Sequence, residues 1–288
     1  MKKLLIILAA VLCLTACKKE TDDTPQPVGD KSTVRFDFNP YQMEPMKGGT
    51  KNASLSTVCS RLDVYIIDTV AADTLRCHQE RGTTPGFGSL TATLQTTKTY
   101  KLVAVGHNTD DTCTFNGGIV SFADDKVKQS LVSVVTFTPA DSLNLHVVMQ
   151  RIVGMFKLRI ADPDEEFANV AKFQFTVDSA YNRWNVNTSH GSVLTSRVHT
   201  ITGTNRGSDG YVTYNVYIIP DNLTDIRHVD ITASALDASD QPIETRHFPS
   251  VPVKAGYVTK YTGTFFITFD MSFLFEVGDW GELSDTSF

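Results

Sequence analysis

The sequence has few cysteines, no excess of basic charge and almost no helical periodicity, and each shortage removes a class of protein. Its 288 residues include 5 cysteines at irregular spacings, too few for a disulfide scaffold. Lys plus Arg number 26 against 32 Asp plus Glu, so the net charge is -6 and nucleic acid is not expected as a partner. Charged residues make up 20% and hydrophobic residues 41%, which indicates a folded, soluble body rather than a disordered chain or a polytopic membrane protein.

Catalytic and cofactor motifs are also missing from the sequence. It contains no HExxH, GxSxG or GxxxxGK[ST] motif, and its nearest approach to GxGxxG, residues 86–91, lacks the last glycine. The spacing of Cys59, Cys77 and Cys113 does not match that of zinc ligands. We therefore expect no enzyme, no metal and no cofactor. A disulfide between Cys77 and either of the other two stays open.

The N-terminus has the pattern of an exported bacterial lipoprotein. Two lysines precede an apolar stretch, residues 4–14, that at about 11 residues is too short for the ~20 that a spanning helix needs. The stretch ends in Leu-Thr-Ala-Cys17, which resembles the lipobox at which a prolipoprotein is cleaved and its cysteine acylated. We therefore predict a signal peptide over 1–16 and lipid attachment, palmitate included, at Cys17. An ordinary secretory signal with a chance cysteine is the alternative.

The residues after Cys17 are polar and contain two prolines, so residues 17–32 are predicted to form a flexible tether. Their acidic cluster resembles the surface-export signal of lipoproteins in the Bacteroidetes lineage. The expected location is the outer membrane, with the protein held by its lipid anchor and facing the cell exterior.

From Val34 onward the apolar residues recur with a period of two, which is the spacing of half-buried strands. Many such short runs, separated by turn signals, predict an all-β protein of β-sandwiches. The pattern predicts that six residues face a core: Leu62, Val64, Leu145, Phe156, Leu158 and Phe175. We place a boundary near Arg151, between an N-terminal sandwich over 33–150 and a C-terminal sandwich over 151–268, because one strand over 143–160 would be too long for a small sheet.

A single helical turn is expected after Asp162-Pro163, with Asp162 as its N-cap and Pro163 in the first helical position. Asp162, Asp164, Glu165 and Glu166 also form an acidic cluster that suits calcium weakly. We interpret this cluster as a solvated loop.

The C-terminal segment keeps one alternating register over residues 261–277, or ~55 Å at ~3.3 Å per residue. An exposed apolar strand of this length would aggregate unless another chain covered its edge, and strand addition between subunits would do so. We therefore treat 269–288 as a candidate donor strand with five partner-binding residues: Phe269, Met271, Phe273, Phe275 and Val277. The alternative is a final strand and its return in the same domain, with a tight turn near Asp270.

Several segments resemble the fimbrillin superfamily of Bacteroidales, specifically its anchor or accessory subunits. They are residues 62–68 (LDVYIID), 100–108 (YKLVAVGHN), 151–158 (RIVGMFKL), 261–266 (YTGTFF) and 278–280 (GDW). The resemblance implies two tandem transthyretin-like β-sandwich domains and hetero-oligomeric assembly with fimbrial subunits by donor-strand exchange. Stalk subunits of that family lose an N-terminal strand by cleavage after an arginine. Here Arg35 lies inside the first strand pattern and no loop arginine follows before Arg61, which favours a subunit that keeps its first strand.

Two functions therefore remain in view. The first is a non-catalytic surface lipoprotein that acts as a fimbrial anchor or accessory subunit. The second is a surface lipoprotein that binds a glycan or a host protein through exposed aromatic residues, with Tyr181 and Trp184 on a loop. A linear apolar strand favours the first, and an aromatic platform on one face would favour the second.

The lipobox pattern generates the first testable prediction. Cys17→Ser removes the sulfur that would carry the lipid, so the protein should move from the membrane pellet to the soluble fraction or stall before cleavage. Fractionation and acyl labelling measure this result, with Cys59→Ser as the matched control. Unchanged fractionation and acylation in the Cys17 variant would rule out a lipid anchor at this position.

Overall fold

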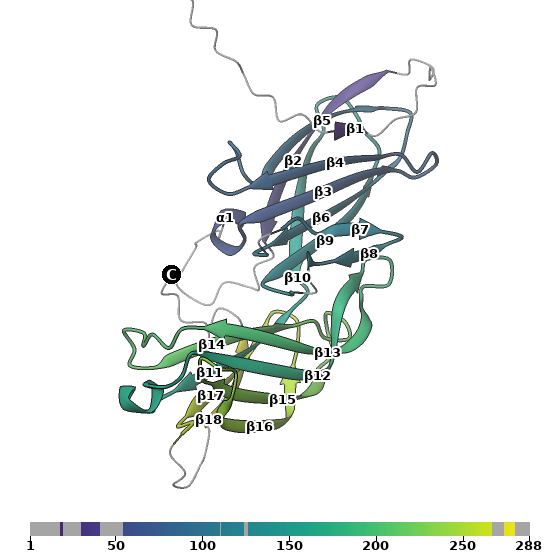
Figure 1. The fold of residues 1–288 in the computed structure, drawn as a ribbon. Helices are drawn as coiled ribbons and strands as arrows, with labels where there is room; N and C mark the ends of the chain where they lie inside the picture. The colour runs from purple at the N-terminus through teal and green to yellow at the C-terminus, as the bar shows by residue number, and fades with distance from the viewer. Residues whose placement is uncertain are drawn as a thin grey trace, which may run out of the picture.

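The computed structural model describes residues 18–19, 30–40, 54–109, 111–123, 126–266 and 274–279, and nearly all of its regular structure is β. Within this part of the chain, no helix is long and apolar enough to cross a bilayer. We call residues up to Arg151 the N-terminal half and the residues after it the C-terminal half (Figure 1).

The N-terminal half contains ten strands and one short helix among its described residues. They are β1 (Lys18–Lys19), β2 (Lys31–Pro40), α1 (Leu55–Val58), β3 (Arg61–Asp68), β4 (Thr74–Glu80), β5 (Ser89–Gln95), β6 (Tyr100–His107), β7 (Thr114–Asn116), β8 (Ile119–Ser121), β9 (Ser130–Phe137) and β10 (Asn144–Arg151).

The C-terminal half continues with eight described strands and one 3-10 turn, η2 (Asp164–Phe167). The strands are β11 (Gly154–Ile160), β12 (Lys172–Asn185), β13 (His190–Thr202), β14 (Val212–Ile218), β15 (Arg227–Leu236), β16 (Pro242–Val253), β17 (Tyr257–Gly263) and β18 (Leu274–Asp279).

The N-terminal half is a sandwich that closes through β10. Its strands pair in the order β1-β4-β3-β6-β9-β10-β2-β5, and β10 changes partner along its length. Residues 144–149 run parallel to β2, whereas Gln150 and Arg151 pair with β9. β2 and β5, at one end of this strand order, face β3 and β6, because one core collects side chains from all four strands. This core includes Val34, Phe36, Leu62 and Leu102.

The C-terminal half has a core of its own between two sheets. One sheet has the order β14-β11-β17-β18, and the other contains β16, β15, β12 and β13. Phe156 and Leu158 of β11 and Phe173 and Phe175 of β12 lie fully buried between them. The all-β prediction is confirmed, and so are the strand phases: five of the six predicted core residues are buried and Leu145 is half-buried against its core.

A third core joins the two halves. The β7–β8 hairpin of the N-terminal half pairs with the end of β12, with Ser121 opposite Arg183 and Val120 opposite Trp184. Figure 1 shows β12 and β13 rising from the C-terminal half to meet this hairpin. Trp184, only 2% exposed, packs with Val103 and Val105 on the face of β6 that points away from the first core. The sheet of β3, β6 and β9 is therefore apolar on both faces.

Buried polar groups fix the start of the hairpin. Asp63 Oδ2 accepts the Cys113 amide N–H at 2.9 Å, and the Tyr65 hydroxyl donates to the Cys113 carbonyl at 2.8 Å. Asp63 and Tyr65 are two residues apart on β3, so their side chains point to the same face of the strand. One of them binds the backbone N–H of Cys113 and the other binds its carbonyl. The segment that leads into β7 is thereby tied to β3.

One local prediction is wrong. The helical turn after Pro163 exists as η2, but Asp162 does not cap it, because its carboxylate turns inward to other backbone groups.

The predicted tether over 17–32 lies mostly outside the described residues. At its start, Lys18 and Lys19 pair with Arg76 and Leu75 at the edge of β4, and at its end residues 31–32 belong to β2. An open sheet edge offers backbone groups to any extended segment nearby, and residues 18–19 use it.

The grip on Cys113 generates a stability prediction. Tyr65→Phe leaves the buried Cys113 carbonyl without its donor, which should lower the free energy of unfolding by ~1–3 kcal/mol. Tyr211→Phe is the control, because it removes the same hydroxyl group from a half-buried tyrosine and keeps the ring, whose centroid lies 4.0 Å from the Arg159 guanidinium. This variant should change the free energy of unfolding by under about 0.5 kcal/mol. Denaturant melts measure both. Equal stability of the two variants would contradict the role given to Tyr65.

Candidate strand-addition interface

The chain reverses direction after β17 instead of continuing as one long strand. β17 ends at Gly263, and β18 pairs with it antiparallel, from Thr262 opposite Leu274 to Tyr257 opposite Asp279. The expectation of a single strand over 261–277 is therefore wrong, and the alternative with a return strand describes the structure. β18 is the last strand in its sheet, so among the described residues its outer edge has no strand partner.

A buried carboxylate explains where the long strand ends. Asp162, fully buried, accepts the backbone N–H of Phe265 and, at 3.1 Å, that of Phe266. These two donors are thereby taken out of the sheet ladder. The side chain of Phe265 is also fully buried, against Phe173 at 5.1 Å between ring centroids. The chain is therefore pinned to the core of the C-terminal half as far as residue 266.

The predicted partner-binding residues fall into two groups. Phe275 and Val277 lie in β18, opposite Tyr261 and Thr259. Phe269, Met271 and Phe273 lie outside the described residues, as does Cys17.

One described ion pair supports the backbone ladder between β17 and β18. It joins Lys260 Nζ to Glu276 Oε2 at 2.5 Å, with the glutamate side chain 41% exposed. Exposed ion pairs of this kind contribute ~0–1 kcal/mol. The backbone hydrogen bonds of β18 to β17 are of a kind that another strand edge could also provide.

The first strand, β2, occupies its own groove completely. It runs parallel to β10 on one side and antiparallel to β5 on the other, and Val34, Phe36 and Phe38 are buried. Arg35 lies within this strand as predicted, on the exposed phase, where its guanidinium pairs with Asp37 Oδ1 at 3.2 Å. An arginine in the middle of a strand that is paired on both sides is a poor protease site.

The aromatic pair suggested for ligand binding does not form a surface platform. Trp184 is buried in the third core, and both residues belong to β12 rather than to a loop. Tyr181 is half-buried, with the Arg227 guanidinium 4.8 Å from its ring centroid. The loop prediction is wrong because the strand pattern of β12 continues beyond the bulge between Val177 and Ala180.

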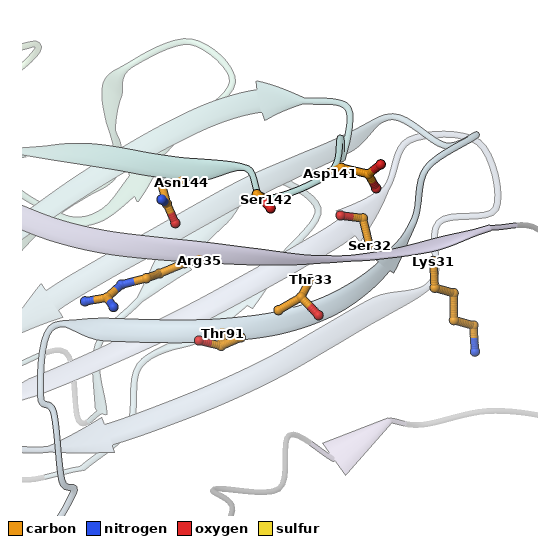
Figure 2. Close-up of a pocket in the computed structure, with 8 residues that line it drawn as sticks. All are labelled: Lys31, Ser32, Thr33, Arg35, Thr91, Asp141, Ser142 and Asn144. Carbon is orange, nitrogen blue, oxygen red and sulfur yellow. The ribbon is translucent and has the colours of Figure 1, made fainter.

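A shallow polar depression runs along β2 on the N-terminal half. Figure 2 shows its lining residues, which come from β2, β5, the turn before β10 and the first residue of β10. They are Lys31, Ser32, Thr33, Arg35, Thr91, Asp141, Ser142 and Asn144. No aromatic side chain lines it, so it lacks the stacking surface that a glycan site was expected to have.

Neither of the two disulfides that the sequence left open, Cys59–Cys77 and Cys77–Cys113, is formed. Cys59 and Cys113 are buried free thiols, so neither forms a disulfide with Cys77. Cys77 is disulfide-bonded, and its partner lies outside the described residues. Burial, the largest cause, raises the pKa of the Cys59 thiol to about 12, which makes it unreactive.

The anchoring role of Asp162 can be tested with its neighbour as the control. Asp162→Ala leaves two buried N–H groups without an acceptor and should lower the free energy of unfolding by ~2–4 kcal/mol. Asp164 forms an ion pair with Arg206, but its side chain is 81% exposed. Because exposed ion pairs contribute little, Asp164→Ala should change the free energy of unfolding by under about 1 kcal/mol. Urea unfolding measures both. An Asp162 variant as stable as the Asp164 variant would show that the carboxylate does not hold residues 265–266.

No protein-family model and no curated protein matches the sequence significantly. Solved structures do match the fold. A candidate adhesin from Bacteroides ovatus is 14% identical, with 87% of this chain and 95% of that chain covered and a TM-score of 0.51. A candidate cell adhesion protein from the same species is 14% identical, with 87% and 98% covered and a TM-score of 0.49.

The tip fimbrial protein Mfa3 from Porphyromonas gingivalis, with a C-terminal truncation, is 11% identical, with 87% of this chain and 100% of that chain covered and a TM-score of 0.44. At such low identities the similarity concerns the fold alone. It rests on the first of these structures, because its TM-score is above 0.5. The resemblance to surface proteins of Bacteroidales that the sequence indicated is thus confirmed at the level of the fold.

Proposed function

We propose that this protein is a non-catalytic cell-surface lipoprotein that serves as a fimbrial anchor or accessory subunit and joins partner subunits by β-strand addition. The observation that carries the proposal is the position of β18. It is an edge strand that comes after a fixed point at Asp162, in a chain whose fold matches that of a candidate adhesin.

The fixed point at Asp162 separates the folded body from its last segment. The core of the C-terminal half takes Phe265 as a buried member and Phe266 as a partly buried one. In this proposal the segment after 266 leaves β17 while Asp162 holds residues 265–266 to the body.

Exchange of β18 between molecules costs little backbone energy. The hydrogen bonds that β18 makes to β17 would be remade with a recipient strand, while the apolar row at 269–277 would add side-chain contacts in the recipient groove. Backbone bonds then supply affinity, and the spacing of the aromatic side chains supplies specificity.

The occupied groove of β2 supports an anchor or accessory role over a stalk role. Removing β2 would expose the pockets of Val34, Phe36 and Phe38, which Leu90 and Val147 help to line. Its arginine is protected by pairing on both sides. A subunit that retains this strand offers no recipient groove there, so it would end or root an assembly rather than propagate it.

A lipid on Cys17 completes the proposal. Its thioether would occupy the Cys17 sulfur, and Cys13 would be removed with the signal peptide. Cys77, although disulfide-bonded in this structure, would therefore carry a reduced thiol in the mature lipoprotein. Acylation would fix the protein to the outer membrane, facing the exterior, and two acyl chains exceed the weak hold of a single one. The pairing of Lys18 with Arg76 would keep the membrane end beside β4 of the N-terminal half. The C-terminal segment belongs to the other half, which leaves it available to a fimbrial subunit further from the membrane.

The competing function is binding of a glycan or a host protein at the surface. The polar depression along β2 favours it, because Lys31, Arg35 and Asn144 offer hydrogen-bond donors (Figure 2). Its shallow shape and its lack of aromatic residues make it a weaker basis than the edge strand.

The proposal is tested by changing the apolar row without removing the body. Triple substitution of Phe269, Met271 and Phe273 by Ser should abolish recovery of fimbrial subunits in affinity pull-downs from detergent-solubilised envelopes. If the segment is donated, the body should melt within about 2 °C of wild type, because Asp162 and Phe265 still tie residues 265–266 to the core. The control changes the other phase of the same segment, Asp270→Ala with Ser272→Ala, and should retain the partners.

Deleting residues 269–288 provides the second arm. A soluble, folded monomer that has lost its partners supports donation of the strand. An unfolded or aggregated deletion, or undiminished partner recovery by the triple variant, would contradict strand addition and favour the binding-protein alternative.

A further inference from the structure

Three side chains with metal-binding atoms converge in the seam between the two halves. They are Asp63 of β3, His107 at the end of β6 and Cys113 just before β7. One ligand atom from each lies within 4.8 Å of the other two, and the residues are 4%, 0% and 3% exposed. A carboxylate, an imidazole and a thiol buried together are the donor types that Zn²⁺ uses in proteins.

The outer contacts of these residues resemble those that orient metal ligands. His107 Nε2 lies 2.8 Å from Asp63 Oδ2, while its other ring nitrogen, Nδ1, lies 2.5 Å from Thr109 Oγ1. The second oxygen of Asp63 is 2.7 Å from His78 Nδ1. Thr109 and His78 would thus hold the imidazole and the carboxylate while Nε2 and Oδ2 turn to a metal.

The donor set suits a divalent cation. Asp63 Oδ2 lies 2.9 Å from the Cys113 backbone nitrogen and 2.8 Å from His107 Nε2, so it already stands between the other two residues. A bound Zn²⁺ would take the place of the contact with Nε2 and would stabilise the Cys113 thiolate directly.

We propose that Asp63 Oδ2, His107 Nε2 and Cys113 Sγ form a zinc site, with a water in the fourth position. As Zn²⁺ replaces the hydrogen bond between Asp63 and His107, Oδ2 and Nε2 would move slightly apart from 2.8 Å, to the ~3.3 Å between two ligands of a tetrahedral zinc. Cys113 Sγ, which lies within 4.8 Å of both, would move toward them. Zinc would then bind the loop before the β7–β8 hairpin to β3 and β6. The site thereby strengthens the joint between the two halves.

His78, which contacts Asp63 directly, has a side chain that is 33% exposed, so the site lies one side chain below the surface at this point. Sequence spacing groups Cys113 with Cys59 and Cys77. In the fold, Cys113 instead lies beside Asp63 and His107, which are 50 and 6 residues away along the chain, so no short motif contains all three.

The site is tested on the full-length chain in detergent after treatment with a chelator. Co²⁺ should produce near-ultraviolet thiolate charge-transfer absorption with a stoichiometry of about one, and Zn²⁺ should then abolish it. Zn²⁺ alone should raise the Tm by about 4 °C or more, as expected for a ligand at a large excess over its Kd.

Two cysteine variants separate the site from adventitious binding. Cys113→Ser should lose the absorption band and the Zn²⁺ shift of the Tm, whereas Cys59→Ser, which removes the other buried free thiol, should retain both. His107→Gln should weaken Zn²⁺ binding at least tenfold.

If a variant does not fold, competition of the wild-type chain against a zinc-sensitive dye still decides the question. Absence of saturable binding by the wild type, or equal binding by the Cys113 and Cys59 variants, would overturn the proposal and leave the cluster a purely hydrogen-bonded one.

Discussion

Burial of one sheet on both faces is the constraint on which the rest of this structure depends. β3, β6 and β9 pack against β2 and β5 on one side and against Trp184, Val186 and Ile219 on the other. The second contact exists because the β7–β8 hairpin extends the sheet of the other half. A buried backbone needs every polar group satisfied, and Asp63 and Tyr65 meet this need at Cys113. The two halves are therefore joined by a core and by continuous strand pairing.

The C-terminal segment contrasts with this seam. Asp162 and Phe265 tie residues 265–266 to the core, and the backbone of β18 pairs with one neighbouring strand, β17. The cores fix the body, whereas β18 lies at a sheet edge. Under the proposed function, the backbone hydrogen bonds of β18 would be satisfied between two molecules instead of within one, and the apolar side chains would select the partner.

Sequence reasoning succeeded where the signal was local. Alternation along a strand determines which side chains share a face, and it correctly placed Leu62, Val64, Phe156 and Phe175 in cores. It failed where distant residues decide the outcome. Asp162 meets Phe265 from 103 positions away, and this contact ends a strand that alternation alone would have continued. The hairpin at 114–121 joins β12 of the other half, and nothing in its short sequence indicates that pairing. Within the proposed donor row, only the backbone positions of Phe275 and Val277 can be compared with the prediction.

The proposed function depends most on the last segment acting between molecules. A photo-reactive phenylalanine analogue at position 273, activated in intact cells, tests this claim without removing any part of the chain. Strand donation predicts cross-links from residue 273 into a second polypeptide, identified by mass spectrometry as a fimbrial subunit. Cross-links found solely within the chain's own C-terminal half, in cells that carry assembled fimbriae, would contradict it.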